Sequence, residues 1–211
     1  KALNGLAESS LGAATAYVTA TKIDNLAAQS FVALGTALAT FAGQNCGAGR
    51  MDRVRKGVKA GMVYTVCGAA IGLAFCMGLY YPLMNLFLNA EIDPNVALYH
   101  DDILAYGFKY LLFQSANYFF LGTIYIYRNT LQGIGKSVLA MLGGVVELAA
   151  RVLTAFVFVK ILEFTGVCIS NPVAWVSCDV FLFAAYLVVM RGIRKKEKMP
   201  DEQQTSLSAA A

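Results

Sequence analysis

The stretch RNTLQGIGKSVLAMLGGVVELAAR, residues 128–151, decides the fold of this chain. Its pattern predicts the end of one apolar helix, a tight basic turn, and the first half of a second helix. Glu147 and Arg151 are four residues apart in otherwise apolar sequence, so they share one face of that helix. A charge at bilayer depth is costly, and such residues usually face a bundle interior or a wet cavity. The stretch therefore suggests the hypothesis of a secondary transporter.

Composition supports a membrane setting for this stretch. Of the 211 residues, 58% are hydrophobic and only 14% are charged, whereas a soluble domain carries about 25% charged residues. The deficit indicates an integral membrane protein that is mostly helical. The single histidine, His100, and the absence of a recognisable catalytic motif argue against an enzyme. The five cysteines form no CxxC pair, so we expect small buried hydrophobic residues and no metal site.

Apolar runs alternate with polar or glycine-rich stretches and predict an all-α membrane protein with about five transmembrane helices. Roughly 20 residues cross a bilayer, so the longest runs must tilt or protrude. The predicted spans are residues 13–43, 57–87, 103–127, 137–162 and 171–190. They make up a helical region over residues 13–192, between a short extracellular lead-in at 1–12 and a basic, polar tail at 193–211. A link before the last span, EFTGVCISNP, places Pro172 in the first turn of a helix.

The positions of Lys and Arg predict the orientation of these spans. Basic residues collect in the turn after the first span, in the turn between the third and fourth spans, and in the C-terminal tail. Because basic residues favour the cytoplasmic side, we expect the N-terminus outside and the C-terminus in the cytoplasm. This interpretation assigns the basic residues to topology and not to nucleic acid, despite a formal net charge of +4. An odd number of spans that starts outside suggests that at least one preceding helix is missing.

Three charged residues lie deep in the predicted spans. Glu147 is about 15 Å into the fourth span, near the middle of a ~30 Å core. Asp179 lies at a similar depth in the fifth span, if the two helices pair antiparallel. Two carboxylates against the single guanidinium of Arg151 leave a surplus negative charge, which needs a proton, a cation or another basic residue. Two interpretations stay open: an internal ion pair that holds helices together, or a direct role in ion coupling or substrate binding.

Aromatic and small polar side chains inside the apolar runs are candidates for the wall of a substrate path. Lys22 and Asp24 have an alternative interpretation as interfacial residues whose charged ends reach the headgroups. The GIG of residues 133–135 lacks the full spacing of a phosphate-binding loop and predicts a helix-ending turn. The cavity-lining candidates are Tyr17, Lys22, Asp24, Gln29, Gln114, Asn117 and Tyr118.

Several segments together resemble the multidrug and toxic compound extrusion family, in particular the C-terminal lobe of its bacterial members. They are TKIDNLAAQSF, QNCGAGRMDRVRKG, RNTLQGIGKS, GGVVELAARV and NPVAWVSCD, over residues 11 to about 195. The resemblance implies most of one six-helix lobe, with a substrate cavity between two lobes. It also implies alternating access driven by H⁺ or Na⁺, with no other cofactor. The first lobe and the seventh helix of the family's twelve are absent from this sequence.

We therefore expect a fragment of a cation-coupled multidrug antiporter in the bacterial inner membrane. Its expected partners are an amphipathic small-molecule substrate, the lipid bilayer and the missing N-terminal lobe. A lipid-linked oligosaccharide flippase or polysaccharide exporter of the same superfamily is an alternative, which a groove lined with several arginines would favour. A non-transporting membrane scaffold is a second alternative, because half of a transporter can be inert.

Overall fold

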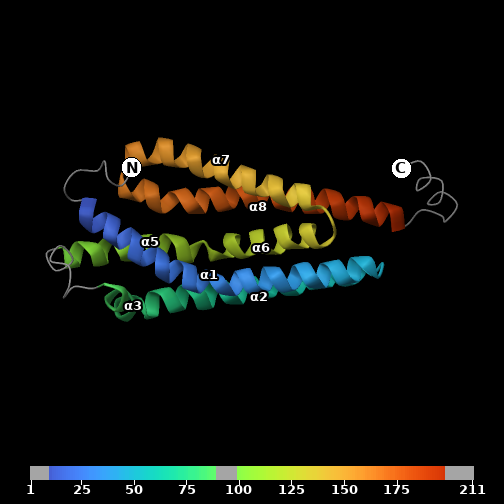
Figure 1. The fold of residues 1–211 in the computed structure, drawn as a ribbon, viewed down its shortest axis with the longest axis horizontal. Helices are drawn as coiled ribbons and strands as arrows, with labels where there is room; N and C mark the ends of the chain where they lie inside the picture. The colour runs from blue at the N-terminus through green and yellow to red at the C-terminus, as the bar shows by residue number, and fades with distance from the viewer. Residues whose placement is uncertain (1–9, 89–98, 198–211) are drawn as a thin grey trace.

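The computed structural model describes residues 10–88 and 99–197, and these residues form helices along almost their whole length. Most of the predicted lead-in, the acidic segment 89–98 and the tail after residue 197 lie outside the described residues. Figure 1 shows the long helices lying lengthwise beside one another. The helices are α1 (Ser10–Gly47), α2 (Met51–Gly78), α3 (Tyr80–Phe87), α5 (His100–Ala116), α6 (Tyr118–Gly133), α7 (Ser137–Leu162) and α8 (Phe164–Glu197).

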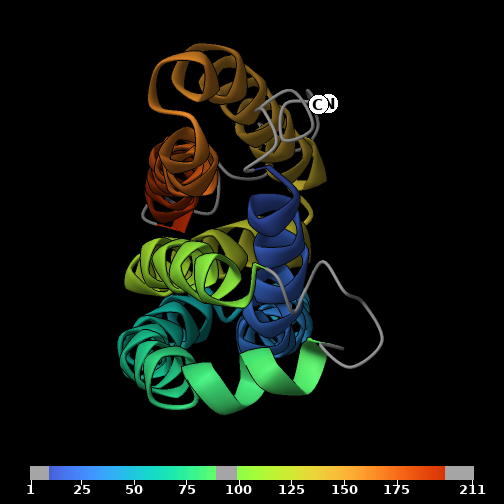
Figure 2. The same ribbon diagram turned by 90° about the vertical axis from the view of Figure 1, so that its left-hand side faces the viewer.

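The helices α5 and α6 form the centre of the bundle. Helix α6 contacts α1 and α2 on one side and α7 and α8 on the other. Figure 2, which looks along the bundle, shows α7 and α8 as one pair and α1 and α2 as another, with α5 and α6 between them. The largest fully buried side chains include Tyr80, Tyr110 and Tyr118, which fill the spaces between these layers.

The outside of the bundle is apolar, as expected of a membrane protein. Within residues 10–88 and 99–197, three helices are long and apolar enough to cross a membrane: Leu11–Gly47, Met51–Gly78 and Phe164–Lys195. At 1.5 Å per residue, the 28 residues of α2 extend about 42 Å and exceed a hydrocarbon core of ~30 Å. Large apolar side chains such as Val63, Ile71, Leu153 and Phe156 are more than 60% exposed. Soluble proteins rarely expose so much contiguous apolar surface, so the described helices form an all-α membrane protein.

Two glycine turns have the same geometry and lie at the same end of the bundle. Gly49, after α1, and Gly135, after α6, have φ of 69° and 79°. Next to them, the backbone N–H groups of Arg50 and Lys136 donate to carbonyls five residues back, at 2.8 Å each. This is the Schellman arrangement, in which a left-handed glycine ends a helix. The GIG segment is therefore a helix-ending turn, as its spacing predicts.

The basic segments share one end of the molecule. Figure 1 shows the α1–α2 turn, the α6–α7 turn and the C-terminal end of α8 together at that end. An ion pair of 2.9 Å between Arg55 of α2 and Glu197 of α8 joins two of these segments. The clustering agrees with the alternation of charge along the sequence.

The structure corrects the expected course of two spans. The link before the fifth span is helical, because α8 begins at Phe164, directly after Glu163 at a φ of 49°. Pro172 therefore lies inside α8 and not in its first turn. The second span is divided at Leu79 into α2 and the short α3, and its basic residues from Arg53 onward already belong to α2.

The third span is a broken helix. Helix α5 ends at Ala116 and α6 begins at Tyr118, with Asn117 between them at φ −104° and ψ 10°. The side-chain amide of Asn117 donates to the carbonyl of Phe113 at 2.8 Å. Its backbone carbonyl accepts from the N–H of Phe120 at 3.0 Å. An asparagine satisfies freed backbone groups in this way without proline or glycine.

Candidate ion and substrate site

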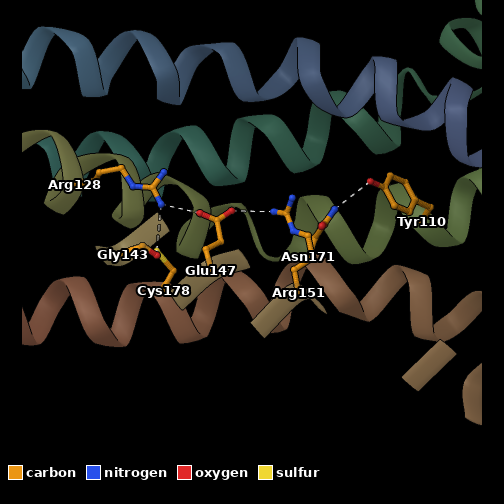
Figure 3. Close-up of polar contacts among 7 residues, drawn as sticks. All are labelled: Tyr110, Arg128, Gly143, Glu147, Arg151, Asn171 and Cys178. Carbon is orange, nitrogen blue, oxygen red and sulfur yellow. Dashed lines mark hydrogen bonds and ion pairs between the residues drawn. The ribbon is translucent and has the colours of Figure 1, made fainter. Parts of the chain in front are cut away.

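Glu147 lies between two guanidinium groups. Its Oε2 accepts a hydrogen bond of 2.7 Å from Arg128 on α6, and its Oε1 accepts one of 2.9 Å from Arg151, one turn further along α7. Figure 3 shows the three side chains in a row between the two helices. The side chain of Glu147 is 20% exposed, against 28% for Arg128 and 46% for Arg151. We call this row the Arg–Glu–Arg ladder.

The Arg–Glu–Arg ladder changes the number of positive charges that must be set against the buried carboxylates. Only Arg151 was counted against Glu147 and Asp179, whereas the structure adds Arg128, which the sequence assigned to a topological turn. Glu147 thus faces two cations and holds no surplus negative charge. This arrangement favours the interpretation of Glu147 and Arg151 as part of an internal ion pair that holds α6 and α7 together.

Asp179 lies near the ladder without joining it. It follows Cys178, whose Sγ is 3.4 Å from Arg128 Nη2 and 3.2 Å from the carbonyl oxygen of Gly143. One oxygen of Asp179, Oδ1, is buried and has no hydrogen-bond partner among the described residues. The two helices α7 and α8 pack tightly here, because the absent side chain of Gly143 leaves room for Leu182. Asp179 is therefore a half-buried carboxylate on α8, next in sequence to a cysteine that contacts the ladder.

A second carboxylate, Asp24, has a different environment. It is only 6% exposed, in the middle of α1. Its Oδ1 accepts a hydrogen bond of 2.9 Å from the hydroxyl of Tyr118, the first residue of α6. The thiol of Cys76 on α2 lies 3.4 Å from the same hydroxyl and completes the contact. Among the residues that the structure describes, no Lys, Arg or His forms an ion pair with Asp24.

The lack of a cationic partner gives Asp24 a particular chemistry. A buried carboxylate without a counter-charge is costly in its ionised form, so it favours a bound proton or a bound cation. Tyr118 can offer one hydrogen bond to the ionised form, but a hydroxyl carries no charge that would neutralise it. Asp24 thus differs from Glu147, which is already neutralised by its arginines.

Polar side chains extend from the break in the third span toward α1 and α8. The hydroxyl of Tyr110 lies 3.5 Å from Thr21 Oγ1 on α1 and 3.4 Å from Asn171 Nδ2 on α8. Figure 3 shows the amide of Asn171 directed at this hydroxyl. The ring of Tyr17 packs edge-on against the ring of Tyr110, with centroids 5.1 Å apart. We call this group, together with Gln114, the polar seam.

The seven cavity-lining candidates are divided by the structure. Tyr17, Asp24, Gln114, Asn117 and Tyr118 come together around the helix break and the polar seam. Lys22 and Gln29 are exposed, and Lys22 Nζ lies 5.8 Å from the ring centroid of Phe87.

Two surface cavities lie outside the polar seam. One, of about 450 Å³, is lined by residues of α6 and α7 that include Arg128 and Gln132. The other, of about 430 Å³, lies between α1 and α2. Within the described ranges, no group of three His, Cys, Asp or Glu residues is placed to hold a metal ion.

Sequence reasoning missed three residues of this region. Arg128 was assigned to the basic turn, although it precedes that turn by more than one helical turn and so reaches back along α6. Tyr110 was not singled out, and Asn171 was placed in the link before the last span. Tyr110 carried a local signal, because it is one helical turn before Gln114 on α5. Arg128 and Asn171 meet their partners across helices, so they could be found only with the helix pairing known.

Comparison with known proteins identifies a family but no individual relative. A family model described as MatE matches residues 5–157, more than half of the chain. No curated protein matches the sequence. No solved structure matches it either.

Proposed function

Because the chain belongs to the MatE family of membrane transporters, we propose that it is part of a cation-coupled multidrug antiporter. In this proposal it forms the C-terminal lobe and exports amphipathic organic cations by alternating access, driven by H⁺ or Na⁺. The observation that carries the proposal is Asp24, a carboxylate only 6% exposed that no described basic residue neutralises. Such a group can couple ion binding to a conformational change, because a proton or cation removes the free-energy cost of the buried negative charge.

Asp24 on α1 lies where α1, α2 and α6 meet, so binding of an ion to it affects the contacts of all three helices. Among the described residues, its hydrogen-bond partner is Tyr118, which begins α6 at the break in the third span. Discontinuous helices at mid-membrane depth are typical of transporter sites. When a proton or cation neutralises Asp24, the hydrogen bond from Tyr118 weakens, and α1 and α6 can change their contact. In this way, ion binding at Asp24 would change which side of the membrane the substrate path opens to.

The role proposed for the Arg–Glu–Arg ladder is structural. Arg128 and Glu147 come from different helices, so the ladder holds α6 against α7 while α1 and α6 rearrange. Asp179 remains a second candidate for ion coupling, with its unpartnered Oδ1. The proposed orientation, with a cytoplasmic C-terminus in a bacterial inner membrane, is supported by the gathering of the basic turns at one end of the bundle.

The flippase alternative needs arginines that are free to bind an anionic sugar or phosphate. Among the described residues, Arg128 and Arg151 lie between helices of the bundle, but both are engaged by Glu147. Arg50 and Arg53 are exposed at the α1–α2 turn, so they do not line a groove inside the bundle. An acidic site at Asp24 also repels anions. The local charges therefore favour a cationic substrate over a lipid-linked oligosaccharide.

Flux measurements in proteoliposomes test this proposal. The protein, expressed from its complete gene, is reconstituted with ethidium outside and DNA inside, so that entry is read as fluorescence. An imposed H⁺ or Na⁺ gradient should drive ethidium movement well above that of empty vesicles. Gradient-independent movement of a fluorescent lipid-linked sugar would support the flippase instead. Absence of any flux, with a correctly folded protein, would support the scaffold alternative and contradict the proposal.

A further inference from the structure

An apolar cleft lies on the surface between α1 and α2. Its volume is about 430 Å³, within the range of sites that hold small molecules. Its walls include Leu34 and Phe41 from α1 and Tyr64 from α2. Phe41 and Tyr64 remain 38% and 46% exposed, so the cleft is open along its length.

Small residues create this cleft. Ala37 on α1 and Gly57, Ala60 and Gly61 on α2 line its floor. The α2 residues from Gly57 to Tyr64 cover about 10 Å at 1.5 Å per residue. One leaflet of a ~30 Å hydrocarbon core is about 15 Å deep. The cleft therefore matches the length of an acyl-chain segment within a single leaflet.

The cleft is basic at the end near the α1–α2 turn. Arg53 is four residues before Gly57, and Arg50, at the N-cap of α2, is seven residues before it. Residues at these spacings share one face of a helix, so both exposed arginines lie on the cleft face. Lys59, two residues beyond Gly57, lies on the opposite side of α2, and Arg55 is engaged by Glu197.

We propose that this cleft binds an anionic phospholipid, with an acyl chain against Ala37 and Ala60 and its phosphate at Arg53 and Arg50. An organic cation is excluded as the occupant because the arginines repel it. A zwitterionic lipid gains less from the two positive charges, and a free phosphate gains nothing from the apolar walls. The proposal requires only that α1 and α2 span a membrane, so it stands whether or not the chain exports drugs.

Photolabelling tests this site. The full chain is reconstituted in phosphatidylcholine vesicles with phosphatidylglycerol that carries a photoreactive group in its acyl chain, and the labelled peptides are mapped. Label should concentrate in residues 34–41 and 57–64. Unlabelled phosphatidylglycerol should compete, while added phosphatidylcholine and glycerol phosphate should not. Label spread evenly over the exposed helices, or none in the cleft because another segment fills it, would overturn the proposal. Equal competition by phosphatidylcholine would also overturn it.

Matched variants separate the headgroup from the acyl chain. Arg53→Gln should reduce labelling about fivefold, as expected for one basic residue near an anionic headgroup. Lys59→Gln removes an equal charge from the opposite face and should leave labelling unchanged. Ala37→Leu with Ala60→Leu should fill the cleft and abolish labelling, whereas Ala70→Leu, at an exposed position outside the cleft, should not. Equal losses of labelling in the test and control variants would contradict the proposal. If a variant misfolds, the competition experiment on the unaltered chain decides the question.

Discussion

The side-chain amide of Gln114 on α5 donates a hydrogen bond of 3.2 Å to the backbone carbonyl of Cys168 on α8. Cys168 is four residues before Pro172, which lies inside α8 and has no N–H to offer its carbonyl. Gln114, which is fully buried, supplies the donor that the proline removes. This bond explains how a proline is accommodated within the helix and how α5 is fixed against α8.

A double-mutant cycle tests this relationship. Gln114→Leu should lower the free energy of unfolding by about 1 kcal/mol, because the carbonyl of Cys168 loses its donor. In a Pro172→Ala background the restored backbone N–H can bond to that carbonyl, so Gln114→Leu should cost clearly less there. Thermal unfolding in detergent gives the four stabilities. An equal cost in both backgrounds would show that Gln114 does not compensate for the proline.

The crossing of α1 and α6 depends on Gly133. A Cβ added to Gly133 would meet the backbone carbonyl oxygen of Ala39 on α1, which cannot move away as a flexible side chain can. Gly133→Ala should therefore destabilise the protein by roughly 1–3 kcal/mol. The matched control is Gly144→Ala within α7, where a Cβ has open space. It should be neutral or stabilising by up to about 1 kcal/mol. Similar unfolding temperatures for the two variants would contradict the close approach.

The two arginines of the ladder should contribute unequally. Arg128 reaches Glu147 from another helix, 19 residues away in sequence, while Arg151 is on the same helix and is 46% exposed. Arg128→Gln should cost ~2 kcal/mol of stability, as for a hydrogen bond to a charged group that joins two helices. Arg151→Gln should cost ~0.5 kcal/mol, as for an exposed pair on one helix. Thermal unfolding of both variants shows which arginine contributes more to stability. A larger loss for Arg151→Gln would refute the role of Arg128 in holding α6 against α7.

Composition and charge pattern were sufficient to predict the helical membrane fold and the positions of its long helices. Each of the helices α1, α2, α7 and α8 contains most of one predicted apolar run, although α2 ends before its run does and α8 begins before its run does. The glycine turns were also predictable, since a left-handed residue at the end of a helix favours glycine. The spacing of Glu147 and Arg151 placed both on one helix face, where the structure has them 2.9 Å apart.

Contacts between helices were not predictable from local patterns. Arg128 meets Glu147 only because the turn at Gly135 folds α6 back against α7, a pairing that spacing within one helix does not encode. The break at Asn117 contains neither proline nor glycine, so the usual signals were missing. Pro172 suggested a helix start because proline is favoured there, and its tolerance inside α8 depends on a donor from a different helix.

The coupling role proposed for Asp24 is tested most directly by proton and sodium fluxes measured together with substrate flux. In proteoliposomes, Asp24→Asn removes the ionisable group but keeps a side chain of the same size beside Tyr118. The account predicts that this variant loses gradient-driven ethidium transport, while Asp24→Glu retains part of it. The control Asp52→Asn, at an exposed position in the first turn of α2, should transport normally. Unchanged, gradient-dependent transport by Asp24→Asn would contradict the central claim that Asp24 binds the coupling ion.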